Sequence, residues 1–97
     1  MISIDWLREW FEINEPDLAF AGIAYSIFVP RTESENPAQV IDIERGQKAA
    51  RVSLWESGEF DFESIDSVTG ETVLFEHHVI ESSESLGDVL TNRVFML

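Results

Sequence analysis

Apolar and charged residues alternate through the middle of the chain, residues 51–80, in a pattern typical of antiparallel strands. Two turn sequences interrupt the alternation: Glu-Ser-Gly at 56–58 and Ser-Val-Thr-Gly at 67–70. Paired residues of neighbouring strands share a face of the sheet, so the burial of one apolar face decides the register. We therefore predict three strands joined by hairpins, with one apolar face and one acidic face.

The predicted register extends to the preceding strand, 40–44, through a turn at 45–48. In the last hairpin, Phe62 should pair with Phe75 and Asp61 with Glu76, because shifting the pairing by one residue would bring Phe opposite Asp or Glu. The residues expected on the apolar face are Ile41, Ile43, Val52, Leu54, Phe60, Phe62, Val73, Phe75 and Val79.

An amphipathic helix is predicted at each end of the chain. The first begins after Ser3, carries a stripe of Trp and Phe residues, and should end near Asn14 because Pro16 disfavours helix at the residue before it. The last begins after Ser82 or Ser83. Its apolar stripe comprises Leu86, Val89, Leu90 and Val94.

Between the first helix and the strand at 40–44, we predict a strand within residues 18–29 and a polar loop over 30–39. Residues 18–20 could instead form a helical turn. The whole chain, 1–97, is then a single α+β domain of order α-β-β-β-β-β-α. Its five-stranded antiparallel meander should carry both helices on one face, because only the helices supply complementary apolar stripes.

The charge of the chain limits its partners. It has 19 acidic and 6 basic residues, a formal net charge of −13, which disfavours nucleic acid and anionic membranes and favours a protein partner with a basic surface. Solubility alone is an equally good explanation of such a charge. There is no cysteine, no signal-peptide pattern and no apolar run of membrane-spanning length, so we expect a cytoplasmic protein.

The second face of the predicted sheet is the candidate binding surface. Trp55 would be an apolar anchor among carboxylates, a combination typical of protein interfaces. Alternatively, Trp55 lies along its neighbours or under the 30–39 loop, and the carboxylates form only a solvated face. The residues expected on this surface are Trp55, Asp42, Glu59, Asp61, Glu63, Glu76 and His78.

Catalytic and metal chemistry have little support. His77 and His78 are adjacent on a strand and point to opposite faces, so they cannot bind one metal together; His77 is expected beside Leu54 and Phe60. A loose site of His78 with Glu59 and Glu76 lacks the further ligand that zinc favours. No nucleophile elbow, phosphate loop or basic aromatic patch is present. We expect no catalytic residue, metal or cofactor, and no enzymatic activity.

Three motifs resemble the TriTu-type family of small bacterial immunity proteins. They are Arg-Val-Ser-Leu-Trp-Glu-Ser-Gly-Glu-Phe-Asp-Phe at 51–62, Asp-Ser-Val-Thr-Gly-Glu at 66–71 and His-His-Val-Ile-Glu-Ser at 77–82. The resemblance implies a non-catalytic inhibitor that binds a cognate toxin in the cytoplasm of the cell that makes the toxin. It marks no contact residues. The alternative is a structural or regulatory module that self-associates through an edge strand or an apolar patch; the sequence leaves the oligomeric state open.

Overall fold

The computed structural model describes residues 2–30, 33 and 35–97, and the order of helices and strands within them is that of an α+β fold. In sequence order, the elements are α1 (Asp5–Ile13), α2 (Glu15–Phe20), β1 (Ala24–Ile27), β2 (Ala38–Arg45), β3 (Lys48–Trp55), β4 (Glu59–Asp66), β5 (Thr72–Val79) and α3 (Ser83–Val94).

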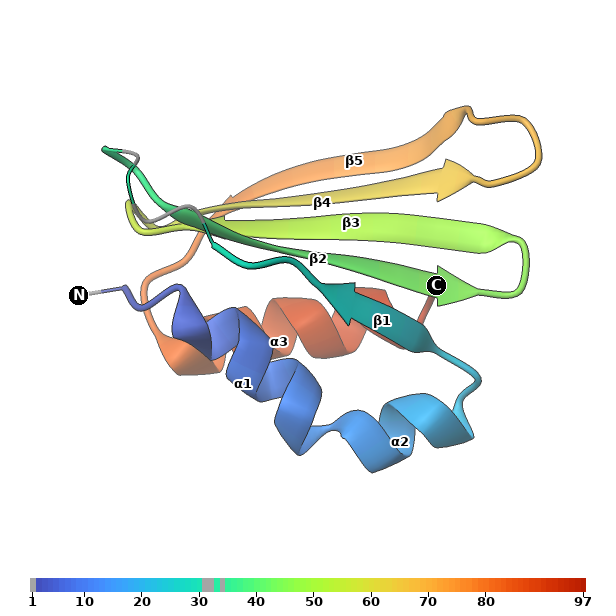
Figure 1. Ribbon diagram of the computed structural model, residues 1–97, viewed down its shortest axis with the longest axis horizontal. Coiled ribbons are helices and arrows are strands. Elements are labelled where there is room, and N and C mark those ends of the chain that lie inside the picture. The colour runs from blue at the N-terminus through green and yellow to red at the C-terminus, as the bar shows by residue number, and fades with distance from the viewer. Residues whose placement is uncertain (1, 31–32, 34) are drawn as a thin grey trace.

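The strands form one open five-stranded sheet in the order β1-β2-β3-β4-β5, each strand antiparallel to the next. All three helices of the described chain lie on one side of this sheet, and the other side is left open (Figure 1). The predicted fold class is confirmed. The two faces are called here the helix face and the open face.

The helix α2 is an addition to the predicted order. Pro16 stands in its first turn, where a proline is tolerated because the N–H that it lacks would be unpaired there anyway. The first helix ends at Ile13, close to the predicted Asn14, but Glu15, where we expected Pro16 to disfavour helix, is the first residue of α2. Leu18, which we placed at the start of a strand, is a fully buried helical residue, and the first strand shrinks to Ala24–Ile27. Positions 31, 32 and 34 of the predicted 30–39 loop lie outside the described residues.

The core lies between the helix face of the sheet and the helices. Every apolar residue that we predicted for this face on β2, β3 and β4 is buried, with at most 2% of its surface exposed. These residues are Ile41, Ile43, Val52, Leu54, Phe60 and Phe62. The helices contribute Leu7 and Phe11 from α1, and Leu86, Leu90 and Val94 from α3. Burying a side chain of this size contributes about 1.5–3 kcal/mol, so this layer stabilises the fold.

Both ends of α3 are held by hydrogen bonds. Of the two serines expected to cap α3, Ser82 is the N-cap, and Ser85 completes a capping box: each serine oxygen accepts from the other's backbone N–H at 3.1 Å. Beyond its C-terminus, the Arg45 Nη1 donates to the carbonyls of Phe95 and Leu97, both at 3.1 Å. At α1 the prediction was wrong by one residue, because Ile4 rather than Ser3 is the N-cap. Arg45, at the end of β2, thereby ties the residues that follow α3 to the sheet.

The register of β5 differs from the prediction. The pairs β2–β3 and β3–β4 have the predicted register, including Ile41 with Val52 and Val52 with Phe62. In the β4–β5 pair, the predicted register holds only at the turn, where Ile65 pairs with Thr72. A β-bulge between Ser64 and Ile65 then leaves one extra residue in β5 and moves every later pair by one position.

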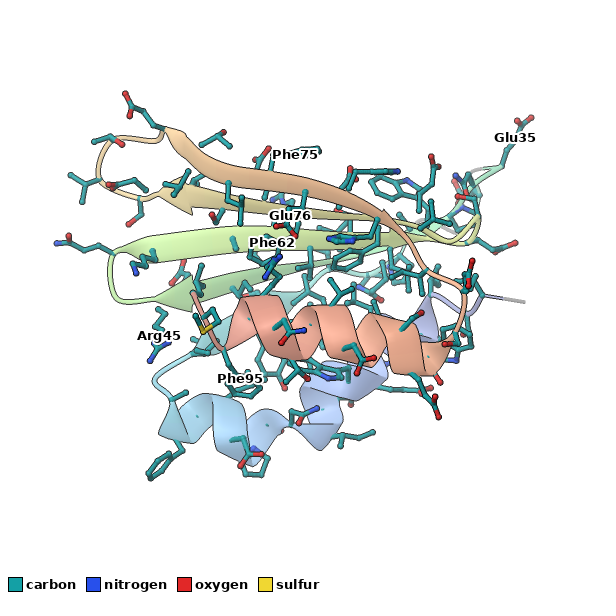
Figure 2. The ribbon with its side chains drawn as sticks, turned by 180° about the vertical axis from the view of Figure 1, so that it is seen from behind. Glu35, Arg45, Phe62, Phe75, Glu76 and Phe95 are labelled. Atoms are coloured by element: carbon teal, nitrogen blue, oxygen red, sulfur yellow. The ribbon has the colours of Figure 1, made fainter. Side chains whose placement is uncertain are left out.

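The bulge exchanges the two faces of β5. Glu76 now lies opposite Phe62, and His77 lies opposite Asp61. The side chains of Val73, Phe75 and Val79, which we expected in the core, are 70%, 55% and 69% exposed. Figure 2 shows Phe75 on the side of β5 away from α3, with Glu76 and Phe62 on the side toward it.

Candidate protein-binding surface

Three rows of side chains cross the open face from β2 to β5. The pairings of the sheet give two full rows, Asp42–Arg51–Glu63–Phe75 and Val40–Ser53–Asp61–His77. The third row is made of the pairs Ala38–Trp55 and Glu59–Val79, with Trp55 and Glu59 on either side of the turn between β3 and β4. Since side chains of directly paired residues share a face, each row is a line of neighbours about one strand spacing apart. The surface therefore joins carboxylates on β2 and β4 to exposed apolar side chains on β5.

Arg51 neutralises one carboxylate of the first row. Its Nε donates to Asp42 Oδ1 at 2.7 Å and its Nη2 to Asp42 Oδ2 at 3.0 Å, a bidentate pair. The hydrogen bond to Asp42 raises the pKa of Arg51, and its charge does so further. The guanidinium also lies 5.6 Å from the ring centre of Phe28, within reach of a cation–π contact. Asp42 is thus already paired within the sheet, whereas Glu63 has no ion pair among the described residues.

His77 occupies the second row, opposite Asp61. Its Nδ1 lies 2.5 Å from Asp61 Oδ1, and its Nε2 lies 3.9 Å from Glu59 Oε1. Two expectations are corrected here. The like-charge pair of Asp61 with Glu76 does not form, and His77 lies on the open face rather than beside Leu54 and Phe60. The predicted repulsion between Asp61 and Glu76 is therefore replaced by a favourable contact between Asp61 and the His77 imidazole.

Glu76 and His78 do not belong to this surface. The bulge places both on the helix face, where Glu76 Oε1 accepts from Arg93 Nε of α3 at 2.7 Å and lies 3.0 Å from His78 Nε2. The hydrogen bond from Arg93 lowers the pKa of Glu76, and that from His78 lowers it further. The ring of His78 lies 6.2 Å from that of Phe60. These two residues help attach β5 to the helix layer instead of facing a partner.

Trp55 lies where we expected it but is half-buried. It lines a groove of about 380 Å³ beside the end of β1. The other residues of the groove are Phe28, Val29, Asn36, Ala38, Val40 and Arg51. The indole therefore packs partly along its neighbours, as the alternative interpretation held, while one side of it borders an open hollow.

The apolar residues of β5 are the part of the surface that the sequence analysis missed. One signal in the sequence pointed to them: the predicted register placed Asp61 directly opposite Glu76, a destabilising pair on a sheet. A shift by one residue removes that pair and puts a histidine in its place. The same shift sends Phe75 and its apolar neighbours to the open face.

No grouping of three or more His, Asp or Glu residues that could hold a metal ion occurs in the described part of the chain. Among those residues, none of the helices has the length and apolar character needed to cross a bilayer.

The sequence was also compared with known proteins. No curated protein matches the chain. The family model described as "Immunity protein TriTu" matches residues 5–94, which extend from α1 to the end of α3.

Proposed function

This chain belongs to the TriTu immunity protein family, and from that premise we propose that its open face binds a toxin domain and blocks it. Immunity proteins neutralise toxins, so the partner is a protein. We further propose that the toxin presents a basic surface and that inhibition, in the cytoplasm of the producing cell, needs no chemistry from this chain.

The observation that carries the proposal is an exposed phenylalanine beside carboxylates. Phe75 is 55% exposed, and its neighbour across the sheet is Glu63. Val79, 69% exposed, has Glu59 as the corresponding neighbour. Protein interfaces commonly combine a buried aromatic anchor with a polar rim, and burial of Phe75 by a partner would supply the anchor. Folding alone gains nothing from leaving these apolar groups in water.

The charge of the chain supports a basic partner. With a net charge of −13, the protein attracts cations over several ångströms at moderate ionic strength. The Asp42–Arg51 and Asp61–His77 contacts order the centre of the open face. Glu63, which has no ion pair among the described residues, and Glu59, whose nearest cationic group is the His77 ring at 3.9 Å, are the carboxylates proposed to pair with Lys or Arg of the toxin. The proposed binding residues are therefore Trp55, Asp42, Glu59, Asp61, Glu63, Phe75, His77 and Val79.

A matched pair of truncations tests the proposal. Phe75→Ala should raise the Kd for the cognate toxin by about ten-fold or more, mainly through faster dissociation, as loss of an aromatic anchor does. Phe20→Ala is the control, because Phe20 is 96% exposed but belongs to α2, on the other side of the sheet. Surface plasmon resonance with the purified toxin domain measures both rates. Unchanged dissociation for Phe75→Ala, or a larger effect of Phe20→Ala, would place the interface elsewhere.

Salt provides a second test of the same surface. Association with a basic toxin should slow as sodium chloride is raised, because screening weakens steering, while dissociation should change less. Glu59→Gln and Glu63→Gln together should reduce this salt dependence. Association that is equally fast in low and high salt would contradict the electrostatic part of the proposal.

A further inference from the structure

One long edge of the sheet is unpaired. β5 is the last strand in the order β1-β2-β3-β4-β5, so only its β4 side has a partner among the described residues. This edge runs over the eight residues Thr72–Val79, whereas the opposite edge strand, β1, has four. An edge strand presents unpaired backbone N–H and C=O groups, which are a template for another strand.

β5 also lacks most of the features that protect edge strands. It contains no proline, lysine or arginine, and the bulge distorts only the end next to the turn. Apolar side chains are exposed on both of its faces: Phe75 and Val79, opposite Glu63 and Glu59, on the open face, and Leu74, 40% exposed and opposite Ser64, on the helix face. Val73, the unpaired residue of the bulge, is 70% exposed. Figure 1 shows β5 at the edge of the sheet farthest from α1 and α2.

The charge of β5 differs from that of the rest of the molecule. Its only carboxylate is Glu76, and that group is already hydrogen-bonded by Arg93 and lies against His78. A second copy of this chain, also at −13, is repelled by the acidic open face but can approach this locally neutral edge.

We propose that β5 pairs antiparallel with β5 of a second copy, so that two sheets become one continuous sheet about a two-fold axis. Such an axis, perpendicular to the sheet, keeps both helix layers on one side and joins the two open faces on the other. It buries the free backbone groups of both edges and brings Phe75 and Val79 of one copy beside β5 of the other. The dimer does not depend on the proposed toxin contact, although Phe75 and Val79 would belong to both surfaces.

Sedimentation velocity across a protein concentration series tests the dimer in the full-length chain. The dimer fraction should rise with concentration and also with salt, because screening reduces repulsion between copies. This salt response is opposite to that expected for toxin binding, so the two proposals can fail separately. A monomer at every concentration and salt would overturn the dimer, and so would a dimer that dissociates as salt rises.

A matched pair of lysine substitutions locates the contact. Leu74→Lys adds a charge at the edge on the helix face and should raise the dimer Kd by about ten-fold or more, because edge lysines oppose strand pairing. Phe20→Lys, the same kind of change on α2, should leave the Kd unchanged. Equal effects of the two substitutions would overturn the assignment to β5.

Hydrogen exchange of the unmodified protein gives an answer that does not depend on a variant folding. Amides of Thr72–Val79 that point away from β4 should exchange more slowly as the dimer forms, while those of β3, already paired on both sides, should not change. Unchanged exchange in β5 of a dimeric sample would rule out pairing through this edge.

Discussion

β4 and β5 are neighbouring strands of eight residues each, but their phenylalanines lie in opposite environments. β4 carries Phe60 and Phe62 between carboxylates, and β5 carries Phe75 between Leu74 and Glu76. In β4, at most 2% of the surface of Phe60 and Phe62 is exposed, whereas Phe75 in β5 is 55% exposed. The comparison teaches that alternation identifies a strand and its two faces, whereas the layer packed over the strand decides which face is apolar.

Two contacts explain why β5 places Glu76, and not Phe75, on the helix face. The helix layer offers Arg93 at this position, and Glu76 meets it at 2.7 Å. On the open face, the same register replaces a repulsion of two carboxylates with the contact of Asp61 and His77. Both contacts join groups of complementary polarity, and they favour the observed register over one that places Phe75 on the helix face.

The largest difference is expected when the two phenylalanines are truncated. Phe62→Ala should lower the free energy of unfolding by about 3–5 kcal/mol, because it removes apolar contacts and leaves a cavity in the core. Phe75→Ala should change it by about 0.5 kcal/mol or less, as for an exposed side chain. Urea denaturation followed by tryptophan fluorescence measures both. Similar losses for the two variants would mean that β5 is covered as well as β4.

A smaller contrast is expected between the hairpin turns on either side of β4. Gly58 and Gly70 both have positive φ, 97° and 75°. A Cβ at Gly58 would lie 2.9 Å from the Ile80 carbonyl oxygen and 3.3 Å from Ile2 Cγ1, whereas one at Gly70 meets nothing within 4 Å. Gly70→Ala should therefore cost about 1–2 kcal/mol from backbone strain alone, and Gly58→Ala more. Thermal unfolding of the two variants compares them; equal shifts would show that the space around Gly58 can adapt.

The smallest effect concerns pH. The pKa of Glu76 is lowered in the folded protein by Arg93 and then His78, so its ionised form stabilises the fold above the ordinary glutamate pKa. That contribution is lost as pH falls through the lowered folded value. Glu76→Gln should destabilise the protein at neutral pH, and the difference from the unmodified chain should shrink in acid. Glu71→Gln, the same change at an exposed position before β5, is the control. A difference that persists unchanged in acid would show that Glu76 acts through packing and not through its charge.

Prediction from the sequence succeeded where several constraints agreed. For β2, β3 and β4, turn length and apolar alternation demanded the same register, and the structure has it. For the C-terminal helix, Ser82 and the apolar stripe together located its start and its buried side. At Pro16, we considered only that proline ends a helix. Proline is also common in the first turn of a helix, and α2, which begins there, was therefore missed.

The candidate surface was predicted correctly only where the register of the strands was. Trp55, Asp42, Glu59, Asp61 and Glu63 lie on strands with the expected register and face away from the helices. Glu76 and His78 depended on the last hairpin, and one inserted residue moved both to the other side.

The sequence by itself determined that this chain forms an acidic α+β domain with one buried sheet face, since turns, helix caps and apolar periodicity are local properties of the chain. Only the tertiary structure decided the orientation of β5 and, with it, the exposed position of Phe75. A single bulged residue exchanges the two faces of the strand without changing its direction. The outcome therefore depends on where α3 places Arg93, which binds Glu76 of β5.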